Sequence, residues 1–312
     1  MTATALRMTD VTKRYGRAGV LALDALSFEI PTGRITGFIG HNGAGKTTAF
    51  SIVAGFLPPD SGAVDILGLG PFDARKLKGK LGVLPQDAAL PDRHTPVELF
   101  RHLCRLQGMG AAAALREADR VLEAVRLGDR RRSRIHTLSH GMRRRVAVAS
   151  ALCGSPALVL LDEPLAGLDP VQAHALRDTI ANLRGTQTVV ISSHNLGELE
   201  RISDRVVMLS AGRCIRQGTL SEVTGQAEVV HWTLAHADAP LDALRARLPD
   251  HTFTLEGVRL TQRAGSEVDL DAASVAVMAV LAEAGVAVRA LSRGVGLERR
   301  FIRDSEAATA PR

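Results

Sequence analysis

The sequence predicts an α/β fold built on a mostly parallel sheet over residues 1–222, followed by a smaller α+β unit. In the first part, short continuous apolar runs alternate with segments of helical periodicity, which is typical of parallel strands buried on both faces. Composition shifts at residues 218–227, where the second unit begins. No apolar run approaches the roughly 20 residues that a membrane-spanning helix needs.

In the first part, apolar runs predict strands and 3.6-residue periodicity predicts helices. The expected strands are Val20–Ile30, Arg34–Ile39, Ala157–Leu161 and Thr188–Ser192, with a closing hairpin of Val206–Leu209 and Arg213–Gln217. The expected helices are Gly45–Ala54, Glu98–Leu106, Ala111–Arg126, Arg143–Leu152 and Val171–Leu183. Thr95, Pro96 and Glu98 mark a helix start, because proline fits the first turn and an acidic side chain is favourable there.

The second unit, residues 223–303, mixes both kinds of segment. Its expected strands are Val229–Leu234, Thr252–Leu255, Val258–Thr261 and Val286–Leu291, and its expected helices are Leu241–Leu248 and Ala272–Ala284. Residues 304–312 are polar and end the sequence, so we expect them to be frayed.

The composition argues against several classes of protein. Hydrophobic residues make up 46% of the chain, which is ordinary for a globular domain and too much for a disordered one. A net charge of +6 and eight Phe, one Tyr and one Trp argue against a stacking platform for nucleic acid, and we expect no nucleic-acid partner. Cys104, Cys153 and Cys214 are too scattered for a disulfide framework or a metal site and fit a reducing compartment. The N-terminus lacks an apolar signal core.

A glycine-rich loop carries the first chemical signal, because residues 40–48 match G-x-x-x-x-G-K-[ST] between an expected strand and an expected helix. Glycines let the backbone curl until its N–H groups point at an anion, and the helix N-terminus adds partial positive charge. Lys46 would reach the β- and γ-phosphates, and the Thr47 hydroxyl would bind Mg²⁺. The candidate nucleotide-binding residues are Gly40, His41, Asn42, Gly43, Ala44, Gly45, Lys46, Thr47 and Thr48.

Two carboxylates follow the apolar strand Ala157–Leu161 directly. A buried strand would deliver Asp162 beside the nucleotide, where its carboxylate can orient Mg²⁺ and the metal-bound waters. Glu163, the next residue, is suited to act as the base for an attacking water.

Polar residues also stand at the ends of two other elements. Ser139 and Gly141 open an expected helix, where the serine is either an ordinary N-cap or part of a second anion site at the helix N-terminus. His194 follows the strand Thr188–Ser192. A lone histidine there is usually structural, but at the same sheet edge as the glycine-rich loop it can reach a γ-phosphate.

In this order, the motifs resemble the nucleotide-binding subunit of ABC (ATP-binding cassette) transporters, which are P-loop NTPases, over residues 4–222. The resemblance implies that Tyr15 stacks on adenine and that Gln86 belongs to the Q-loop, which senses Mg²⁺ and the γ-phosphate. It also implies that Asp169 belongs to the D-loop and that His194 is the switch histidine. The Mg²⁺ site would then consist of Thr47, Gln86 and Asp162, and the cofactors would be ATP and Mg²⁺.

The same resemblance implies an assembly. Two cassettes would dimerise head to tail around two ATP molecules, with the P-loop of one facing Ser139 and Gly141 of the other. We expect the second cassette to be a copy of this chain, and a heterodimer with a different cassette is the alternative that the sequence leaves open. The other partner would be a separately encoded membrane-spanning permease, which docks on residues 87–107 of the helical subdomain (about 87–155). The chain would thus lie on the cytoplasmic face of the cell membrane.

Two departures mark the branch of the family. The usual signature is Leu-Ser-Gly-Gly-Gln, but His140 replaces its first glycine and Met142 its glutamine. The continuation through Arg145 resembles drug-exporter and antibiotic-self-resistance ATPases, and residues 228–303 resemble the small C-terminal domain of drug-exporter-type cassettes. That domain has no catalytic constellation, so we assign it to dimer stabilisation or regulation. The arginine runs at 130–134 and 143–145 are expected to face solvent or phospholipid headgroups.

The leading hypothesis is therefore an ATPase subunit that powers export of a drug, an antibiotic or a lipid-like substrate. Glu163, His194, Asp162 and Gln86 are its expected catalytic residues. One alternative is a regulatory ATP-binding module with weak hydrolysis, which His140 and Met142 would favour. Another is a soluble cassette that works on ribosomes or DNA, and an importer ATPase is the nearest relative within the same class.

Overall fold

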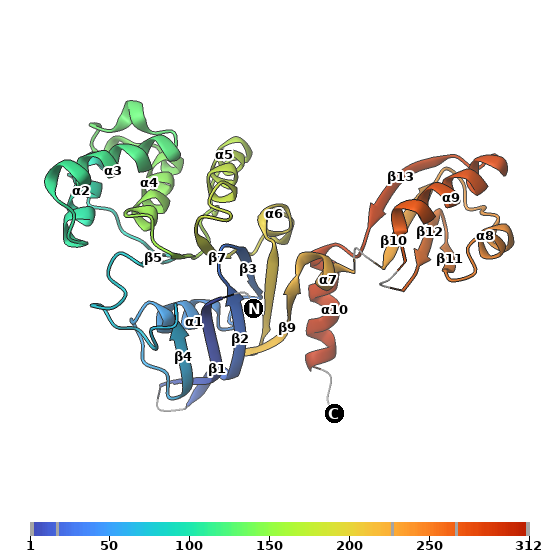
Figure 1. Cartoon of the computed structure of the whole chain (residues 1–312), viewed down its shortest axis with the longest axis horizontal. Helices are drawn as coiled ribbons and strands as arrows, with labels where there is room; N and C mark the ends of the chain where they lie inside the picture. Colours follow the sequence, from blue (N-terminus) through green and yellow to red (C-terminus); the bar gives the residue numbers. More distant parts are fainter. Residues whose placement is uncertain (1–2, 17–18, 226–227, 266–267, 310–312) are drawn as a thin grey trace. The chain divides into compact units, whose positions relative to one another are not determined.

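The computed structural model describes residues 3–16, 19–225, 228–265 and 268–309, and the chain divides into two compact units (Figure 1). Unit 1 comprises Met1–Gln217 and Asp304–Arg312, and unit 2 comprises Gly218–Arg303. In the described residues, unit 1 holds two sheets and unit 2 holds one, and each unit has its own apolar core. None of the helices in the described residues is long and apolar enough to cross a membrane.

The main sheet of unit 1 has six strands in the order β5-β6-β7-β3-β8-β9. They are β3 (Ile35–Gly40), β5 (Leu81–Leu84), β6 (Leu158–Leu161), β7 (Thr188–Ser192), β8 (Arg205–Ser210) and β9 (Arg213–Thr219). The first five strands in this order run parallel, so their carboxyl ends meet at one edge of the sheet. Every residue of β3, β6 and β7 is buried, as their apolar runs predict.

A second, antiparallel sheet in unit 1 has the order β2-β1-β4. It consists of β1 (Thr4–Tyr15), β2 (Val20–Pro31) and β4 (Ser61–Ile66). Helix α1 (Lys46–Val53) joins the core that these strands form with the main sheet. The ring centroid of Phe38 on β3 lies 5.3 Å from those of Phe28 on β2 and Phe50 on α1, so this core holds the start of α1 against both sheets.

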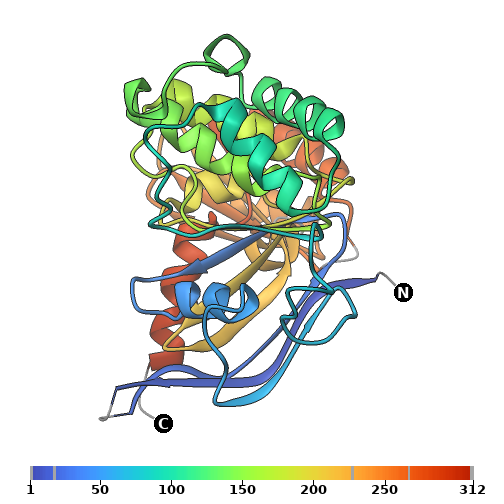
Figure 2. The same ribbon diagram turned by 90° about the vertical axis from the view of Figure 1, so that its left-hand side faces the viewer.

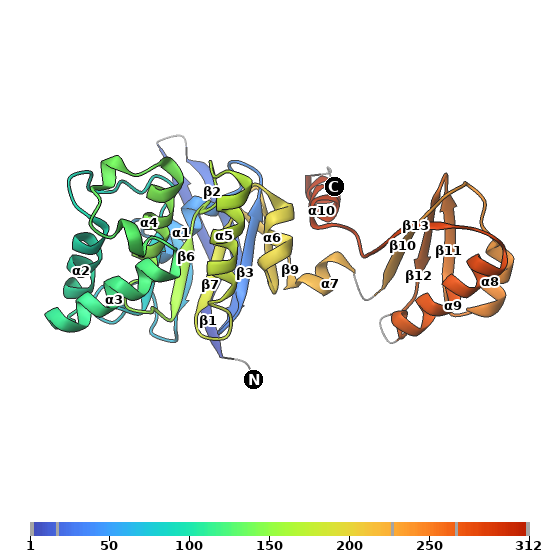
Figure 3. The ribbon, with the colours of Figure 1, turned by 90° about the horizontal axis from the view of Figure 1, so that it is seen from above.

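A group of helices in unit 1 lies on one side of its strands (Figures 2 and 3). They are α2 (Pro96–Leu106), α3 (Ala111–Ala124), α4 (His140–Leu152), α5 (Pro170–Ala181) and α6 (Leu196–Ile202), with 3₁₀ turns at Gly128–Arg130 and Ile135–Thr137. The expected start of α2 is confirmed, because Thr95 and Glu98 form a capping box with Pro96 in the first turn.

Unit 2 is a four-stranded antiparallel sheet in the order β11-β12-β10-β13, with helices packed on it. Its strands are β10 (Val229–Leu234), β11 (Thr252–Glu256), β12 (Arg259–Arg263) and β13 (Val288–Arg293), and its helices are α7 (Leu220–Thr224), α8 (Leu241–Arg247) and α9 (Leu270–Glu283). Trp232 is fully buried in its core, where the Trp232 Nε1–H donates to Gln262 Oε1 at 3.2 Å.

The structure corrects the expectation of a frayed end. Helix α10 (Leu297–Thr309) continues through residues 304–309, and residues 310–312 lie outside the described part. Phe301 is buried and Asp304 pairs with Arg216. The buried Phe301 side chain and the Arg216–Asp304 ion pair thus hold in a helix a segment that its polar composition predicted to be frayed. Strands β1, β4 and β5 were not predicted, because β1 and β4 are half polar and β5 has only four residues.

Candidate functional site

The carboxyl edge of the parallel strands brings the predicted residues together. The loop of residues 41–45 follows β3, Gln86 follows β5, Asp162 and Glu163 follow β6, and His194 follows β7. A cleft of about 900 Å³ opens there, within the range of small-molecule sites. It is lined by Ala22, His41, Asn42, Gly43, Gly45, Lys46, Thr47, Thr48, Gln86, Asp87, His140, Arg144, Asp162, Glu163, Ala166 and His194.

The glycine-rich loop depends on backbone conformations that favour glycine. Gly43 and Gly45 have φ angles of 81° and 101°, and Gly45 is the N-cap of α1. A Cβ on Gly45 would lie 2.6 Å from Leu23 Cδ2 and 2.7 Å from the Ala22 carbonyl oxygen, so no side chain fits. The loop therefore curls tightly enough to turn its N–H groups and the start of α1 toward one point.

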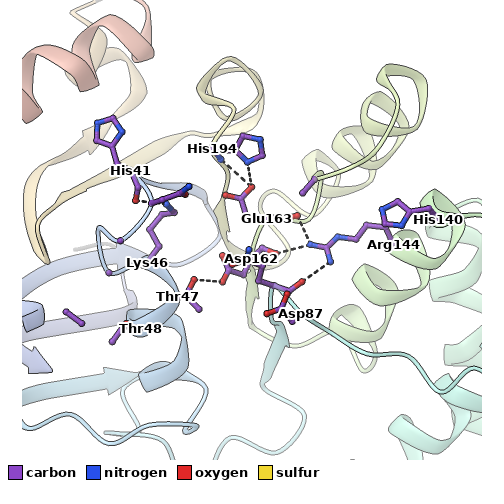
Figure 4. Close-up of a pocket in the computed structure, with 16 residues that line it drawn as sticks. His41, Lys46, Thr47, Thr48, Asp87, His140, Arg144, Asp162, Glu163 and His194 are labelled. Carbon is purple, nitrogen blue, oxygen red and sulfur yellow. Dashed lines mark hydrogen bonds and ion pairs between the residues drawn. The ribbon is translucent and has the colours of Figure 1, made fainter. Parts of the chain in front are cut away.

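The Lys46 side chain folds back onto this loop. Its Nζ donates to the carbonyl oxygens of Gly40 at 2.5 Å and His41 at 3.2 Å (Figure 4). Lys46 is buried, and burial lowers the pKa of its ammonium, although the nearby Glu163 and Asp162 carboxylates oppose that shift. A desolvated cation at a helix N-terminus is suited to bind an anion.

A buried hydrogen-bond network holds Asp162. Its Oδ2 accepts from the Thr47 hydroxyl at 3.1 Å, and its Oδ1 accepts from the Ser192 hydroxyl. The same Ser192 Oγ accepts from the Glu163 N–H at 2.9 Å. Asp162 and Ser192 are 2% and 0% exposed, so one serine from β7 fixes both acidic residues at the end of β6.

Glu163 and His194 form a pair at the mouth of the cleft. His194 Nδ1 lies 2.8 Å from Glu163 Oε2, and the His194 backbone N–H donates to the same oxygen at 3.3 Å. The imidazole is 71% exposed while the Glu163 side chain is 11% exposed. Glu163 has a φ of 51°, a left-handed conformation that costs free energy in a residue other than glycine and recurs at functional sites.

Several predicted residues lie outside the cleft lining. Gly40 and Ala44 are buried in the base of the loop. The Tyr15 hydroxyl is 3.4 Å from Thr48 Oγ1 on α1, and the residue is 40% exposed.

Three further predicted residues occupy helix N-termini. Ser139 caps α4 by accepting from the Met142 N–H at 3.3 Å, and Asp169 caps α5 by accepting from the N–H groups of Val171 and Gln172. At Gly141, a Cβ would lie 1.4 Å from Gln172 Oε1, so a side chain there would require the Gln172 side chain to move. The structure thus shows the N-cap role of Ser139, while any contact of these residues with an anion stays a prediction.

The structure also adds residues that the motifs did not indicate. Ser192 was hidden because it completes an apolar strand. His140 was noted only as a departure, yet its Nε2 would lie 2.9 Å from a Cβ on Gly167, so this ring packs over the turn between Glu163 and Asp169.

The prediction that the arginine run 143–145 faces solvent or headgroups is wrong for two of its members. Arg144 donates to main-chain carbonyls at the ends of β5 and β6, and Arg145 donates to those of Val125 and Arg126. An arginine run on a helix gives no indication of which members turn inward, because the long side chain can bury its stem and still find acceptors.

The oxygen donors at the start of α1 and the end of β6 fit a magnesium ion. The Thr47 hydroxyl and the Asp162 carboxylate are hard ligands already in contact, and Mg²⁺ characteristically takes one or two such groups together with substrate phosphates. In the described residues, no group of three or more His, Cys, Asp or Glu side chains could hold a metal ion.

Comparisons with known proteins agree with this geometry. The family model described as "ABC transporter" matches residues 23–166. The linearmycin resistance ATP-binding protein LnrL of Bacillus subtilis (strain 168) is 32% identical over 288 residues, covering 89% of this chain and 90% of that protein. The doxorubicin resistance ATP-binding protein DrrA of Mycobacterium tuberculosis (strain CDC 1551 / Oshkosh) is 33% identical, covering 79% and 77% respectively.

Other relatives are much longer than this chain. It is 37% identical over 207 residues to ATP-binding cassette sub-family A member 2 of Homo sapiens, of which it covers only 8%. A solved structure titled "Structure of ATP binding subunit of ABC transporter" has a TM-score of 0.63 and 29% identity, covering 71% of this chain and 92% of that one. The cassette MJ0796 bound to ADP and Pi, described as a dimeric post-hydrolysis state, has a TM-score of 0.63 at 24% identity, and this similarity bears on the fold alone.

Proposed function

Because the chain belongs to the ABC transporter family and is an ABC-type ATPase, we propose that it powers an exporter of drug-, antibiotic- or lipid-like substrates. ATP-driven closure of two cassettes would supply the work. The observation that carries the proposal is the meeting of Lys46, Asp162, Glu163 and His194 around one cleft. The likeness to LnrL over 90% of that protein's length, and to DrrA, supports export as the direction.

In this proposal the cleft binds ATP through its phosphates. The backbone of the loop and the ammonium of Lys46 hold the β- and γ-phosphates, and the face of Tyr15 takes the adenine ring. Thr47, Asp162 and Gln86 would hold Mg²⁺, which neutralises charge that develops on the phosphate oxygens. Asp162 is fixed for this by Ser192 and Thr47.

Glu163 acts as the general base for the attacking water. Its carboxylate is nearly buried while its partner His194 is exposed at the cleft mouth, so His194 can turn to a γ-phosphate and leave Glu163 Oε2 free for the water. A positioned base of this kind contributes roughly 10²–10⁴ in rate.

The second cassette completes each site. The N-terminus of α4, with Ser139 and Gly141, and the loop at Asp169 would approach the γ-phosphate bound by the other subunit. Close approach needs a small residue, and Gly141 meets that need. We propose a homodimer, in which both sites are equivalent and both hydrolyse ATP.

The transported molecule would pass through a separately encoded permease that holds this chain at the cytoplasmic face of the cell membrane. The surface around α2, which begins shortly after Gln86, would dock it. A substrate-binding role then belongs to the permease, while this chain responds through the Q-loop.

The test is affinity co-purification of the tagged chain from detergent-solubilised native membranes, with bound proteins identified by mass spectrometry. We expect a polytopic membrane protein at stoichiometric level, and ATP hydrolysis by the purified complex. Recovery of the chain with ribosomes or nucleic acid, and with no membrane protein, would overturn the proposal.

A further inference from the structure

Arg144, on the second turn of α4, makes an unusual set of contacts. Its half-buried side chain reaches the ends of two strands and lines the cleft (Figure 4). The acceptors are all main-chain carbonyl oxygens: Glu163 at 2.5 Å, Asp162 at 3.1 Å, Pro164 at 3.2 Å and Gln86 at 3.4 Å. One side chain from the helical region thus spans the loops that follow β5 and β6.

These carbonyls belong to the residues whose side chains do the proposed chemistry. Gln86 and Glu163 both line the cleft, and Arg144 donates to the main-chain carbonyl oxygen of each. Glu163 is also held in a left-handed conformation, with a φ of 51°. Such a residue keeps its conformation only when its surroundings over-determine it, and here Arg144 and Ser192 bind its carbonyl and its N–H.

The side chain itself is suited to this task. A guanidinium offers five donors in a fixed plane, whereas a lysine offers one point charge on a flexible stem. Burial lowers the pKa of Arg144, and the carboxylates of Asp162, Glu163 and Asp87 oppose that shift. The guanidinium therefore combines four main-chain acceptors with favourable charge interactions with three carboxylates.

We propose that Arg144 is a positioning residue that locks the backbones of Gln86 and Glu163 to the first turns of α4. The Q-loop, the general base and the helix start that carries Ser139 and Gly141 then move as one body. This inference rests on the proposed function, because it assigns Arg144 a part in the same hydrolysis.

The neighbouring residue Arg145 supplies a matched control. It is half-buried like Arg144 and also donates to main-chain carbonyls, those of Val125 at 3.0 Å and Arg126 at 3.1 Å. Its acceptors follow α3 and lie outside the cleft lining. Loss of Arg145 therefore removes a comparable helix anchor without freeing the backbone of Gln86 or Glu163.

The experiment compares Arg144→Ala and Arg144→Lys with Arg145→Ala. For Arg144→Ala we expect kcat for ATP to fall at least about 10-fold while the Kd of a fluorescent ATP analogue changes less than about 3-fold. We expect Arg144→Lys to recover little of the rate, and added guanidinium chloride at millimolar concentration to restore part of it in Arg144→Ala only. For Arg145→Ala we expect kcat within about 3-fold of the parent.

Hydrogen exchange tests the same lock without relying on activity. Amides of residues 86–88, 162–163 and 165–166 should exchange at least about 5-fold faster in Arg144→Ala and Arg144→Lys than in the parent or Arg145→Ala. Unchanged exchange, or a kcat within about 2-fold of the parent in both Arg144 variants, would show that Arg144 is not a positioning residue. Equal losses of rate, binding and exchange protection in the Arg144 and Arg145 variants would also overturn the proposal. A parent chain that hydrolyses no ATP would instead contradict the proposed function, while the exchange comparison would still decide the role of Arg144.

Discussion

Both units bury a small network of polar side chains inside a sheet, but the two networks differ in charge and access. In unit 1, Ser192 links Asp162 and Glu163 at the carboxyl ends of parallel strands, beside an open cleft. In unit 2, Gln262 accepts from Trp232 and donates to His251 Nδ1 at 3.1 Å, and all three residues are buried. The first network is acidic and faces a cavity, whereas the second is neutral and closed.

The contrast shows how strand direction decides what a buried polar group can do. Parallel strands end together, so groups that follow different strands converge at one edge and remain accessible. In unit 2 the buried polar side chains find their partners among themselves, and a satisfied network of this kind specifies packing. We therefore expect changes in the first network to affect catalysis and changes in the second to affect stability.

Removing the base should give the largest effect. Glu163→Gln should lower the rate of ATP hydrolysis by about 10²–10⁴-fold, because the amide cannot accept the proton of the attacking water. ATP binding should persist, measured with a fluorescent analogue, since the phosphate-binding loop is unchanged. The control is Glu256→Gln, an exposed glutamate of unit 2, and a Glu163→Gln rate similar to the control would refute the assignment.

Removing the Ser192 hydroxyl, which bonds to Asp162 and Glu163, should affect both the rate of ATP hydrolysis and the free energy of unfolding. Ser192→Ala leaves the Glu163 N–H without its partner and one Asp162 oxygen without a donor, at a cost of about 1–3 kcal/mol in the free energy of unfolding. The hydrolysis rate should fall about 10-fold, because the carboxylates lose their fixed positions. Ser193→Ala is the neighbouring control for steady-state kinetics and thermal melts, and equal effects of both changes would argue against a specific link.

The corresponding change in unit 2 should leave the rate unaffected. Gln262→Leu strands the Trp232 N–H and the His251 nitrogen in an apolar core, which should destabilise unit 2 by about 1–3 kcal/mol. Trp232 is the one tryptophan of the chain, so urea unfolding followed by its fluorescence reports on this unit. If Gln262→Leu abolished ATP hydrolysis without changing the urea midpoint read from Trp232 fluorescence, the division between a catalytic network in unit 1 and a structural one in unit 2 would be contradicted.

The smallest effect is a dependence of unit 2 on pH. The pKa of His231 lies below its ordinary value of 6.5, chiefly because of burial and also because of Arg259, Arg263 and Arg299. The folded state therefore binds fewer protons than the unfolded chain, and its stability should fall as the pH drops through 6.5. The urea midpoint read from Trp232 should follow this trend, and His231→Gln should reduce the slope. The exposed His236 offers a His236→Gln control that should leave the slope unchanged.

The sequence predicts the position of a site residue well where that residue follows a recognisable strand. Lys46, Asp162 and His194 each follow a strand, and parallel strands place such residues at one edge. Their proposed roles remain predictions, but their meeting around one cleft follows from that topology.

Ser192 and Arg144 could not be found in this way, because their partners are distant in the chain. Ser192 bonds to residues some 30 positions earlier, and Arg144 to the carbonyl of Gln86, 58 positions away. No local pattern distinguishes a serine at a strand end, or one arginine of three, that will meet such a partner. Strands β1 and β4 were missed for a related reason, since their pairing rests on long-range register and their own residues are half polar.

The return of the chain to unit 1 at Asp304 has a practical consequence for expression experiments. In the sequence, unit 2 is an insertion between Gln217 and Asp304 of unit 1, so the chain passes from one unit to the other twice. Arg216 and Asp304, which lie next to these two passages, form an ion pair. A stop codon placed after residue 222 would therefore remove part of unit 1 together with unit 2. An internal deletion of 218–296, closed by a linker, would keep every residue of unit 1, all of α10 including its residues 297–303 from unit 2, and the Arg216–Asp304 pair, and is the better design for studying unit 1.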